Sequence, residues 1–279
     1  MSRQLDNQRQ SHALRCAVRT ALLVVVCAAT AACGSRHKVI ALAGATAFEP
    51  AAEKLVPRFL ATHPDLSVNV QFLGSAVGVQ AALSGAADIG VADFVSLPTN
   101  AAALTSAVVA RDGIAIVVHP TNGVTALTVA QVRAIFAGQT RSWRAVGGAD
   151  RAIHVVCRQE GSGTRTAFDE LVGVVEASGD AVVQDSTAAV RETVANDPDA
   201  IAYMSCAAEN PRVKAVDIDG VACTAGEVAA GRYPLSRPIR FLTRGPPSGP
   251  VAEFIQFALS PEGQAIIRAS GLIPSSGHP

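Results

Sequence analysis

The sequence has no excess of charge of either sign. Its 279 residues include 23 Lys and Arg and 23 Asp and Glu, so the formal net charge is zero, which excludes a broadly basic face for nucleic acid. The chain has no Walker motif, which excludes an ATPase subunit. It also lacks the series of long apolar runs that a permease needs, and it has no internal repeat or low-complexity run. What is present, with 49% hydrophobic residues, is a globular chain long enough for one large or two medium domains.

The N-terminal residues are typical of an export signal rather than of a folded domain. Four arginines precede an apolar, small-residue run over 21–32, which is too short to span a bilayer comfortably. The run leads into Thr-Ala-Ala-Cys-Gly-Ser at 30–35, which resembles the lipobox of bacterial lipoproteins, with Thr30 where leucine is usual. We therefore predict a signal peptide at 1–32 and a lipidated tether at 33–37, attached through Cys33 to the extracytoplasmic face of the membrane. A cleaved signal without lipid and a single anchor helix are the alternatives.

Cysteine is scarce in the exported part, where three residues follow the lipobox: Cys157, Cys206 and Cys223. Export allows disulfides to form, but an odd number permits at most one bridge within the chain. Cys206 and Cys223 are the closer pair and flank a turn-rich stretch, so they are the candidate bridge. Cys157 lies in an apolar run and is interpreted as a small buried hydrophobe. Together with His154 it is only a weak metal signal, and we predict neither a metal nor a cofactor.

The stretch 157–165 (Cys-Arg-Gln-Glu-Gly-Ser-Gly-Thr-Arg) has the pattern of a strand end, a glycine turn and a helix start. The first N–H groups of a helix lack intrahelical partners and carry partial positive charge, so such a turn suits an oxyanion. Ser162 and Thr164 would add hydroxyl donors, and Arg158 a planar fork of donors. An ordinary helix cap is the alternative. Without 1–32 the chain has 19 basic and 22 acidic residues, a net charge of −3, so an anion must be captured locally.

Two earlier segments repeat this strand, turn and helix pattern. A strand at 38–43 is followed by small residues around Thr46 and by helical spacing over 52–60. Residues 74–78 open a second helix, for which we predict Ser75 as the N-cap. A further short strand at 86–93 ends at Asp93, and open α/β sheets place their ligand residues at such strand ends.

The rest of the chain continues the alternation of strands and helices, which predicts α/β architecture. The elements expected are strands at 113–118, 201–204, 213–221 and 239–242, and helices at 128–136, 186–195 and 251–270, with Thr128 as a cap and a break at Pro261. A second domain beginning near Pro120 and ending near 232 would give two lobes joined by two extended crossings. We predict that lobe 1 comprises 38–119 plus 233–279 and that lobe 2 comprises 120–232.

Eight short motifs occur in the same order as in the phosphate-binding proteins of phosphate ABC transporters, and the chain resembles this PstS-like family. They are Gly-Ala-Thr-Ala-Phe-Glu-Pro at 44–50, Gly-Ser-Ala-Val-Gly at 74–78, Ala-Asp-Ile-Gly-Val-Ala-Asp at 87–93, Asp-Gly-Ile-Ala at 112–115, Ile-Phe-Ala-Gly at 135–138 followed by Trp143, Arg-Gln-Glu-Gly-Ser-Gly-Thr at 158–164, Tyr-Pro-Leu at 233–235 and Pro-Glu-Gly-Gln at 261–264. The resemblance covers nearly all of the exported chain. It implies a two-lobed type II periplasmic-binding-protein fold with the ligand in the cleft between the lobes.

The resemblance also implies the ligand, its binding residues and the partners. The phosphate ligands of the family map onto Thr46, the Ala47 backbone, Ser75, Asp93, Arg158, Ser162, Gly163 and Thr164. Position 47 and the segment 94–97 differ from the commoner family patterns. The implied protein is a monomeric lipoprotein that binds inorganic phosphate and delivers it to an ABC permease driven by its ATPase.

Within this mechanism, three helix starts would surround the oxyanion, Arg158 would supply the positive charge, and Asp93 would be the selectivity element. Phosphate carries a proton that a carboxylate can accept, whereas sulfate at neutral pH does not, and a like-charged contact without a proton is costly. A strand-end turn residue or a salt-bridge partner of Arg158 is the alternative interpretation of Asp93.

Two other functions compete with phosphate transport. One is a binding protein of the same architecture for sulfate, molybdate or tungstate. The other is a secreted hydrolase of phosphate esters with Ser162 or Thr164 as nucleophile. The sequence argues against the hydrolase, because Gly161-Ser162-Gly163 lacks the nucleophile-elbow spacing and no histidine stands in a motif that supplies a base. We therefore predict no enzyme and no catalytic residue.

Overall fold

The computed structural model describes residues 38–275, and from Val39 on the chain forms one compact unit. The predicted signal peptide at 1–32, the tether at 33–37 and the lipidated Cys33 lie outside the described residues. No helix in the described range is long and apolar enough to cross a membrane.

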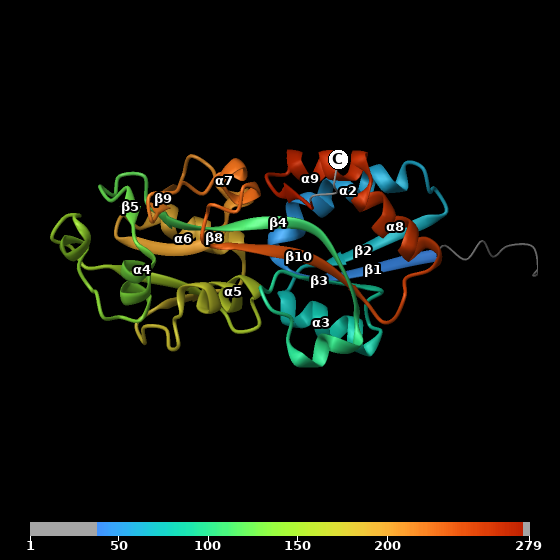
Figure 1. Ribbon diagram of the computed structural model, residues 1–279, viewed down its shortest axis with the longest axis horizontal. Helices are drawn as coiled ribbons and strands as arrows, with labels where there is room; N and C mark the ends of the chain where they lie inside the picture. The colour runs from blue at the N-terminus through green and yellow to red at the C-terminus, as the bar shows by residue number, and fades with distance from the viewer. Residues whose placement is uncertain (1–37, 276–279) are drawn as a thin grey trace, which may run out of the picture. The chain divides into compact units, whose positions relative to one another are not determined.

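A mixed β-sheet forms the framework (Figure 1). Among the described residues eleven strands pair with one another, and the main path runs β2-β1-β3-β10-β4-β8-β6-β7. These strands are β1 (Lys38–Gly44), β2 (Leu66–Gln71), β3 (Ile89–Ala92), β4 (Thr105–Val118), β6 (His154–Arg158), β7 (Val182–Gln184), β8 (Ala200–Ser205) and β10 (Ser236–Thr243). Off this path, β9 (Lys214–Ile218) pairs with β4 and with β5 (Ala126–Leu127), and β11 (Ile273–Pro274) pairs with β4.

The hydrophobic core falls into two large clusters and a smaller one. The first large cluster takes its residues from Ile114 to Leu235 together with Ile273, and includes the stacked rings of Phe168 and Tyr203. The second takes them from 40–110 and 239–272, and includes the edge-to-face pair of Phe48 and Phe241. Two separate cores on one sheet agree with the predicted two-lobed α/β fold. The lobe boundaries at 119/120 and 232/233 stay a prediction.

Strands β4 and β10 run antiparallel between the two clusters (Figure 1). The first half of β4 contributes Val109 and Ala110 to one cluster, and its second half contributes 114–118 to the other. β4 is longer than the predicted strand at 113–118, because its first half pairs with β10 from Thr105 to Gly113. We call β4 and β10 the crossing strands.

Eight α-helices cover the sheet in the described part of the chain. They are α2 (Glu49–Leu60), α3 (Ser75–Ser84), α4 (Val129–Phe136), α5 (Gly163–Val172), α6 (Thr187–Asn196), α7 (Ala225–Ala229), α8 (Gly249–Leu259) and α9 (Pro261–Ala269). Short 3₁₀ turns occur at η1 (Thr46–Phe48), η2 (Thr99–Ala103), η3 (Trp143–Val146) and η4 (Cys206–Ala208). The predicted cap at Thr128 is confirmed by a reciprocal capping box with Gln131. The predicted break at Pro261 is confirmed too, because Ser260 caps α9 directly after α8 ends.

Candidate functional site

Arg158 ends strand β6 and is buried, with 1% of its surface exposed. Its backbone N–H donates to the Tyr203 hydroxyl at 3.1 Å, and its Nη2 donates to the Asp185 carbonyl at 2.7 Å. Nη2 and Nη1 also lie 3.4 Å and 3.5 Å from the hydroxyls of Thr46 and Thr187. The remaining donor, Nε, is buried and has no partner among the described residues. The guanidinium is thus held in one place while a donor stays free for a ligand.

Asp93 follows strand β3 and is also buried, with 1% of its surface exposed. Its Oδ1 accepts from the Ser75 hydroxyl at 2.5 Å, and its Oδ2 accepts from the Thr164 hydroxyl at 3.4 Å. The charged group at ion-pair distance is Arg237, whose Nη1 lies 2.9 Å from Oδ2. The alternative interpretation of Asp93 as a salt-bridge partner of Arg158 is therefore wrong for this structure.

Ser75 does not cap helix α3 as predicted. The N-cap is Gly74, whose φ of 115° is a conformation that glycine adopts readily, and no side chain caps the helix. Ser75 is instead the first helical residue, and its hydroxyl bridges the Asp93 carboxylate and the Asp93 backbone N–H, which it accepts at 3.1 Å. The sequence pattern located the helix start correctly but assigned the hydroxyl to the wrong partner.

The glycine turn at 161–163, at the start of α5, lies against Ser75 and Asp93. Ser162 caps α5 by accepting from the Arg165 N–H at 3.3 Å, so the helix-cap interpretation holds for this residue. Gly163 lies so close to the carboxylate that an added Cβ would be 1.9 Å from Asp93 Oδ1 and 2.2 Å from Ser75 Oγ. The Gly161 carbonyl accepts from the Ala76 N–H at 3.0 Å. Contacts therefore connect the starts of α3 and α5 directly.

Thr46 and Ala47 form the third expected helix start, and both are buried. The chain there makes the 3₁₀ turn η1 before α2 begins at Glu49. The hydroxyl of Thr46 lies 3.4 Å from that of Thr187. A cavity of about 290 Å³ is lined by both threonines and by Ala47, so the Thr46 end of the site opens into a space of small-molecule size.

Two buried residues of the site were not predicted from the sequence. Thr187 is the first residue of α6, which Ser186 caps through the Ala189 N–H, and this adds a fourth helix start to the three predicted. The signal was present, since Ser and Thr open the helix expected at 186–195. Arg237 lies in β10, four residues after Tyr233 begins the Tyr-Pro-Leu motif, and no local pattern indicates its contact with Asp93.

Four charged residues are fully buried in the described chain: Asp93, Asp112, Arg158 and Arg237. Burial lowers the pKa of Arg158, an effect that the Asp93 charge opposes. Burial also raises the pKa of Asp112, although Arg237 and the Ser205 hydroxyl favour its ionised form. Two cations and two carboxyl groups thus share one water-poor region, where electrostatic interactions are stronger than at the surface.

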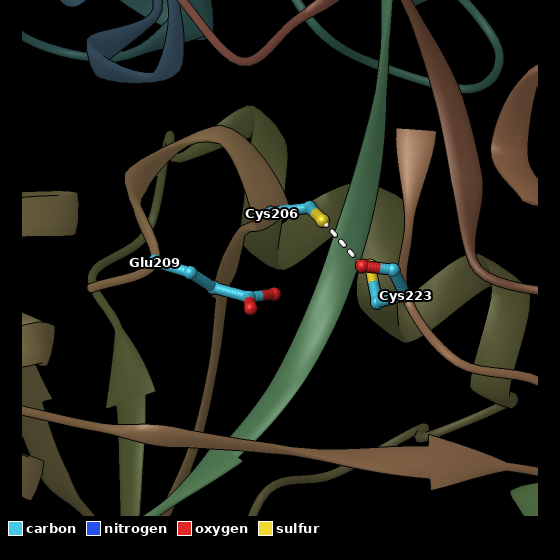
Figure 2. Close-up of side chains that lie close together, drawn as sticks. All are labelled: Cys206, Glu209 and Cys223. Atoms are coloured by element: carbon cyan, nitrogen blue, oxygen red, sulfur yellow. Dashed lines mark hydrogen bonds between the residues drawn. The ribbon is translucent and has the colours of Figure 1, made fainter. Parts of the chain in front are cut away.

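The three cysteines of the described chain are unbonded. Cys157 is buried in β6, as predicted, and burial raises its pKa to about 11. The Cys206 thiol donates to the Cys223 carbonyl at 2.8 Å, and the Cys206, Glu209 and Cys223 side chains lie close together (Figure 2). The disulfide stays a prediction. His154, the other residue of the weak metal signal, pairs with Asp197 at 2.7 Å.

Comparisons with known proteins show consistent similarity. Residues 28–262 match a family described as a PBP superfamily domain. The chain is 32% identical over 242 residues, which cover 84% of it, to the phosphate-binding protein PstS of Bacillus subtilis, 80% of whose length is covered. It resembles the solved structure of a Clostridium perfringens phosphate ABC transporter substrate-binding protein with bound phosphate, at 32% identity and a TM-score of 0.83 over 86% of this chain and 100% of that one. A Vibrio cholerae ABC-type phosphate transport receptor is similar at 31% identity and a TM-score of 0.73, with 84% and 99% covered.

Proposed function

The chain belongs to the PstS family of phosphate-binding proteins within the PBP superfamily, and on that premise we propose that it binds inorganic phosphate and delivers it to an ABC importer. Relatives named as phosphate-binding proteins support the ligand. The importer supplies the permease and the ATPase, because this chain has neither a Walker motif nor a membrane bundle.

The proposed ligand shell consists of the residues implied by the family resemblance: Thr46, the Ala47 N–H, Ser75, Asp93, Arg158, Ser162, Gly163 and Thr164. The observation that carries this proposal is a buried arginine, Arg158, whose Nη2 and Nη1 lie beside the Thr46 and Thr187 hydroxyls and whose Nε has no partner in the described part of the chain. The charge of the buried Asp93 carboxylate also acts on this guanidinium. Arg158 balances the anion with a fixed set of donors. The hydroxyls and the helix N–H groups supply the remaining donors.

Asp93 gives this shell its selectivity. Its carboxylate accepts a hydrogen bond from the proton of HPO₄²⁻ or H₂PO₄⁻, whereas sulfate brings only like charge to the same position. A like-charge contact of this kind costs several kcal/mol, which corresponds to about a thousandfold in affinity. Sulfate, molybdate and tungstate are therefore rejected by an uncompensated contact rather than by size.

Contacts between the helix starts support a binding mode in which the protein closes around its ligand. Ala76 and Gly161 are joined by a backbone hydrogen bond, and Thr46 contacts both Arg158 and Thr187. These pairs join residues from the proposed lobe 1 (38–119 plus 233–279) and lobe 2 (120–232). Closure would present a surface made of both lobes, by which a permease distinguishes the loaded protein from the empty one.

We further propose that the mature protein is a monomeric lipoprotein. The lipobox-like sequence at 30–35 places the lipid on Cys33, and the tether at 33–37 connects it to the folded chain. A diacyl anchor is sufficient to hold a domain on the extracytoplasmic face of the membrane. Radiolabelled palmitate incorporation into the wild type and its loss in Cys33→Ser would test the anchor.

Calorimetric titration of the mature protein with phosphate, arsenate and sulfate tests the function. We expect heat from phosphate and no saturable heat from sulfate at neutral pH. Absence of phosphate binding would refute the proposal, and tighter binding of sulfate or molybdate would assign the site to another oxyanion. Turnover of a chromogenic phosphate ester above trace rates would instead support a hydrolase.

A further inference from the structure

We infer that Arg237 is a positioning residue that holds the Asp93 carboxylate in place through an ion pair, so that rejection of sulfate depends on a cation outside the ligand shell. This inference rests on the proposed binding of phosphate. It assigns to Arg237 a role in specificity that the family motifs do not indicate.

Arg237 is placed between two carboxyl groups. Its exposed fraction is 1%, its Nη1 lies 2.9 Å from Asp93 Oδ2, and its Nη2 donates to Asp112 Oδ2 at 2.9 Å. Nη1 stands at ion-pair distance from Asp93 without the alignment of a hydrogen bond, since it has no hydrogen-bond partner within the described range. The interaction with Asp93 is therefore mainly one of charge.

The backbone around Arg237 fixes this arrangement. Arg237 lies directly opposite Asp112 in the ladder of β10 and β4. Three residues further along β10, Arg240 pairs with Ala92, the neighbour of Asp93, in β3. The arginine is thus anchored by two strands rather than by a loop, so the cation does not need to be recruited when the ligand arrives.

Each charged group around Asp93 comes from a different element. Asp112 on β4 repels its charge, whereas Arg158 on β6 and Arg237 on β10 attract it. Asp112 also accepts from the Ser205 hydroxyl at 3.0 Å. Burial raises the pKa of Asp112, whereas Arg237 and the Ser205 hydroxyl favour its ionised form.

Loss of Arg237 would leave two buried carboxyl groups near each other without the cation between them. Asp93 would lose its ion-pair partner, and its carboxylate would be held only by the Ser75 and Thr164 hydroxyls. A carboxylate that can turn away from the anion opposes sulfate less. Selectivity would therefore fall.

The test is titration of phosphate and sulfate into the mature wild type, Arg237→Gln, Arg237→Lys and Asp93→Asn at neutral pH. For Arg237→Gln we expect the ratio of sulfate to phosphate Kd to fall by about tenfold or more, which corresponds to about 1.4 kcal/mol of lost discrimination. Arg237→Lys keeps the charge and should keep most of the discrimination.

Arg240→Gln is the matched control, because it removes the same charge from the same strand. Arg240 donates to the Phe94 and Val95 carbonyls and not to the Asp93 carboxylate. We expect this control to change the affinity for both anions by similar factors. In the Asp93→Asn background, Arg237→Gln should have no further effect on the Kd ratio.

Several results would overturn the inference. An equal loss of affinity for both anions in Arg237→Gln would indicate a purely structural role for Arg237. The same conclusion would follow if the double variant Asp93→Asn/Arg237→Gln were less selective than Asp93→Asn alone. If Arg237→Gln does not fold, Asp112→Asn decides. Asp93 is then the one carboxylate left to Arg237, so discrimination should be kept, and its loss refutes the inference. Failure of the wild type to bind phosphate would instead refute the proposed function.

A separate observation concerns Cys206 and Cys223, and we propose that oxidation joins them in a disulfide that braces the crossing strand β4. Their sulfur atoms lie within 4.8 Å of each other, with Cys206 directed at the backbone of Cys223 (Figure 2). Both lie near Gly113 of β4, where an added Cβ would be 2.7 Å from Cys223 Sγ and 3.4 Å from Cys206 Cβ. The glycine leaves room for the two cysteines on the strand that connects the two cores.

The oxidation requires a disulfide-bearing thiol oxidoreductase as the electron acceptor. One Sγ–Sγ bond forms and two S–H bonds break, while the two electrons and two protons reduce the disulfide of the oxidoreductase to a dithiol. Contact with Cys223 and burial raise the pKa of the Cys206 thiol, which makes its thiolate scarce in the folded protein. The bond is therefore expected to form during folding after export, before the site closes.

Peptide mapping of the protein from its exported location, without reductant, tests the bridge. We expect a cross-linked peptide pair containing Cys206 and Cys223, with Cys157 free, and faster amide exchange at 111–118 after reduction. Glu209, whose Oε1 is buried and unpartnered in the described structure, lies close enough to complete a metal-binding set with both sulfurs. Recovery of Cys206 and Cys223 as free thiols would overturn the proposal, and so would their protection from alkylation by a metal ion that a chelator removes. Unchanged amide exchange at 111–118 after reduction would also overturn it.

Discussion

Substitution of Gly163 by alanine is expected to weaken phosphate binding without unfolding the protein. The added Cβ would lie 1.9 Å from Asp93 Oδ1, 2.2 Å from Ser75 Oγ and 2.7 Å from Ser75 Cβ. Carbon and oxygen atoms do not approach so closely, so the start of α5 must move away from the end of β3 by more than about 1 Å to reach ordinary contact distance. The backbone N–H of residue 163 remains, so the loss comes from displacement and not from a deleted donor.

The expected size follows from the cost of overpacking a filled site, which is about 1–3 kcal/mol. This range corresponds to a decrease in phosphate affinity of about fivefold to about 150-fold. The clash is between segments of the two proposed lobes, so an open arrangement relieves it and each core stays intact. We therefore expect the melting temperature of the ligand-free protein to change by only a few degrees.

Calorimetry of Gly163→Ala, with Gly123→Ala as the control, measures this effect. An added Cβ at Gly123 has no neighbour within 4 Å, so the control should bind as the wild type does. Wild-type affinity in Gly163→Ala would contradict the reasoning, because the contact between α5 and Asp93 would then play no part in the bound state. Loss of secondary structure by circular dichroism would contradict the expected separation of binding from folding.

Three further predictions concern single side chains. Asp93→Asn should bind phosphate and sulfate with affinities that differ far less than in the wild type, because the amide can donate to either anion; unchanged discrimination in a titration would assign selectivity elsewhere. Thr187→Val removes a hydroxyl at 3.5 Å from Arg158 Nη1 and should weaken phosphate binding by about threefold to tenfold, whereas equal affinity would place Thr187 outside the bound shell. Burial raises the pKa of Cys157 to about 11, so its alkylation in the folded protein should be slow at neutral pH and accelerate as the pH rises towards that value; rapid labelling at pH 7, followed by mass spectrometry, would show that the thiol is not buried.

The helix starts were predictable because their signals are local. Small residues, hydroxyls and glycines mark the beginnings of α3 and α5, and Thr128 and Pro261 mark two boundaries that the structure confirms. Arg158 and Asp93 were predicted to lie near each other from the family resemblance. The close approach of Gly163 to Asp93 and Ser75 has the same cause, because strand ends and helix starts converge there.

Contacts between distant parts of the chain were not predictable in this way. Arg237 and Asp112 are 125 positions apart, and only the pairing of β10 with β4 brings them together. The same pairing explains why β4 begins earlier than its apolar run suggests. The roles of Gly74 and Ser75 were also not predictable from the sequence. The Ser75 hydroxyl could cap α3 or bind Asp93, and in the structure it binds Asp93 while Gly74 is the N-cap.

The position of β10 within the sheet also sets an order of events during synthesis and export. One core cluster draws almost all its residues from the continuous stretch 114–235, whereas the other needs 40–110 and 239–272 together. β10 is inserted between β3 and β4, so that part of the sheet is incomplete until residues 236–243 have emerged. Contacts between segments far apart in sequence form slowly. The part of the protein that carries Arg158 can therefore fold before the part that carries Asp93, which is complete only when β10 has joined the sheet. β10 also carries Arg237.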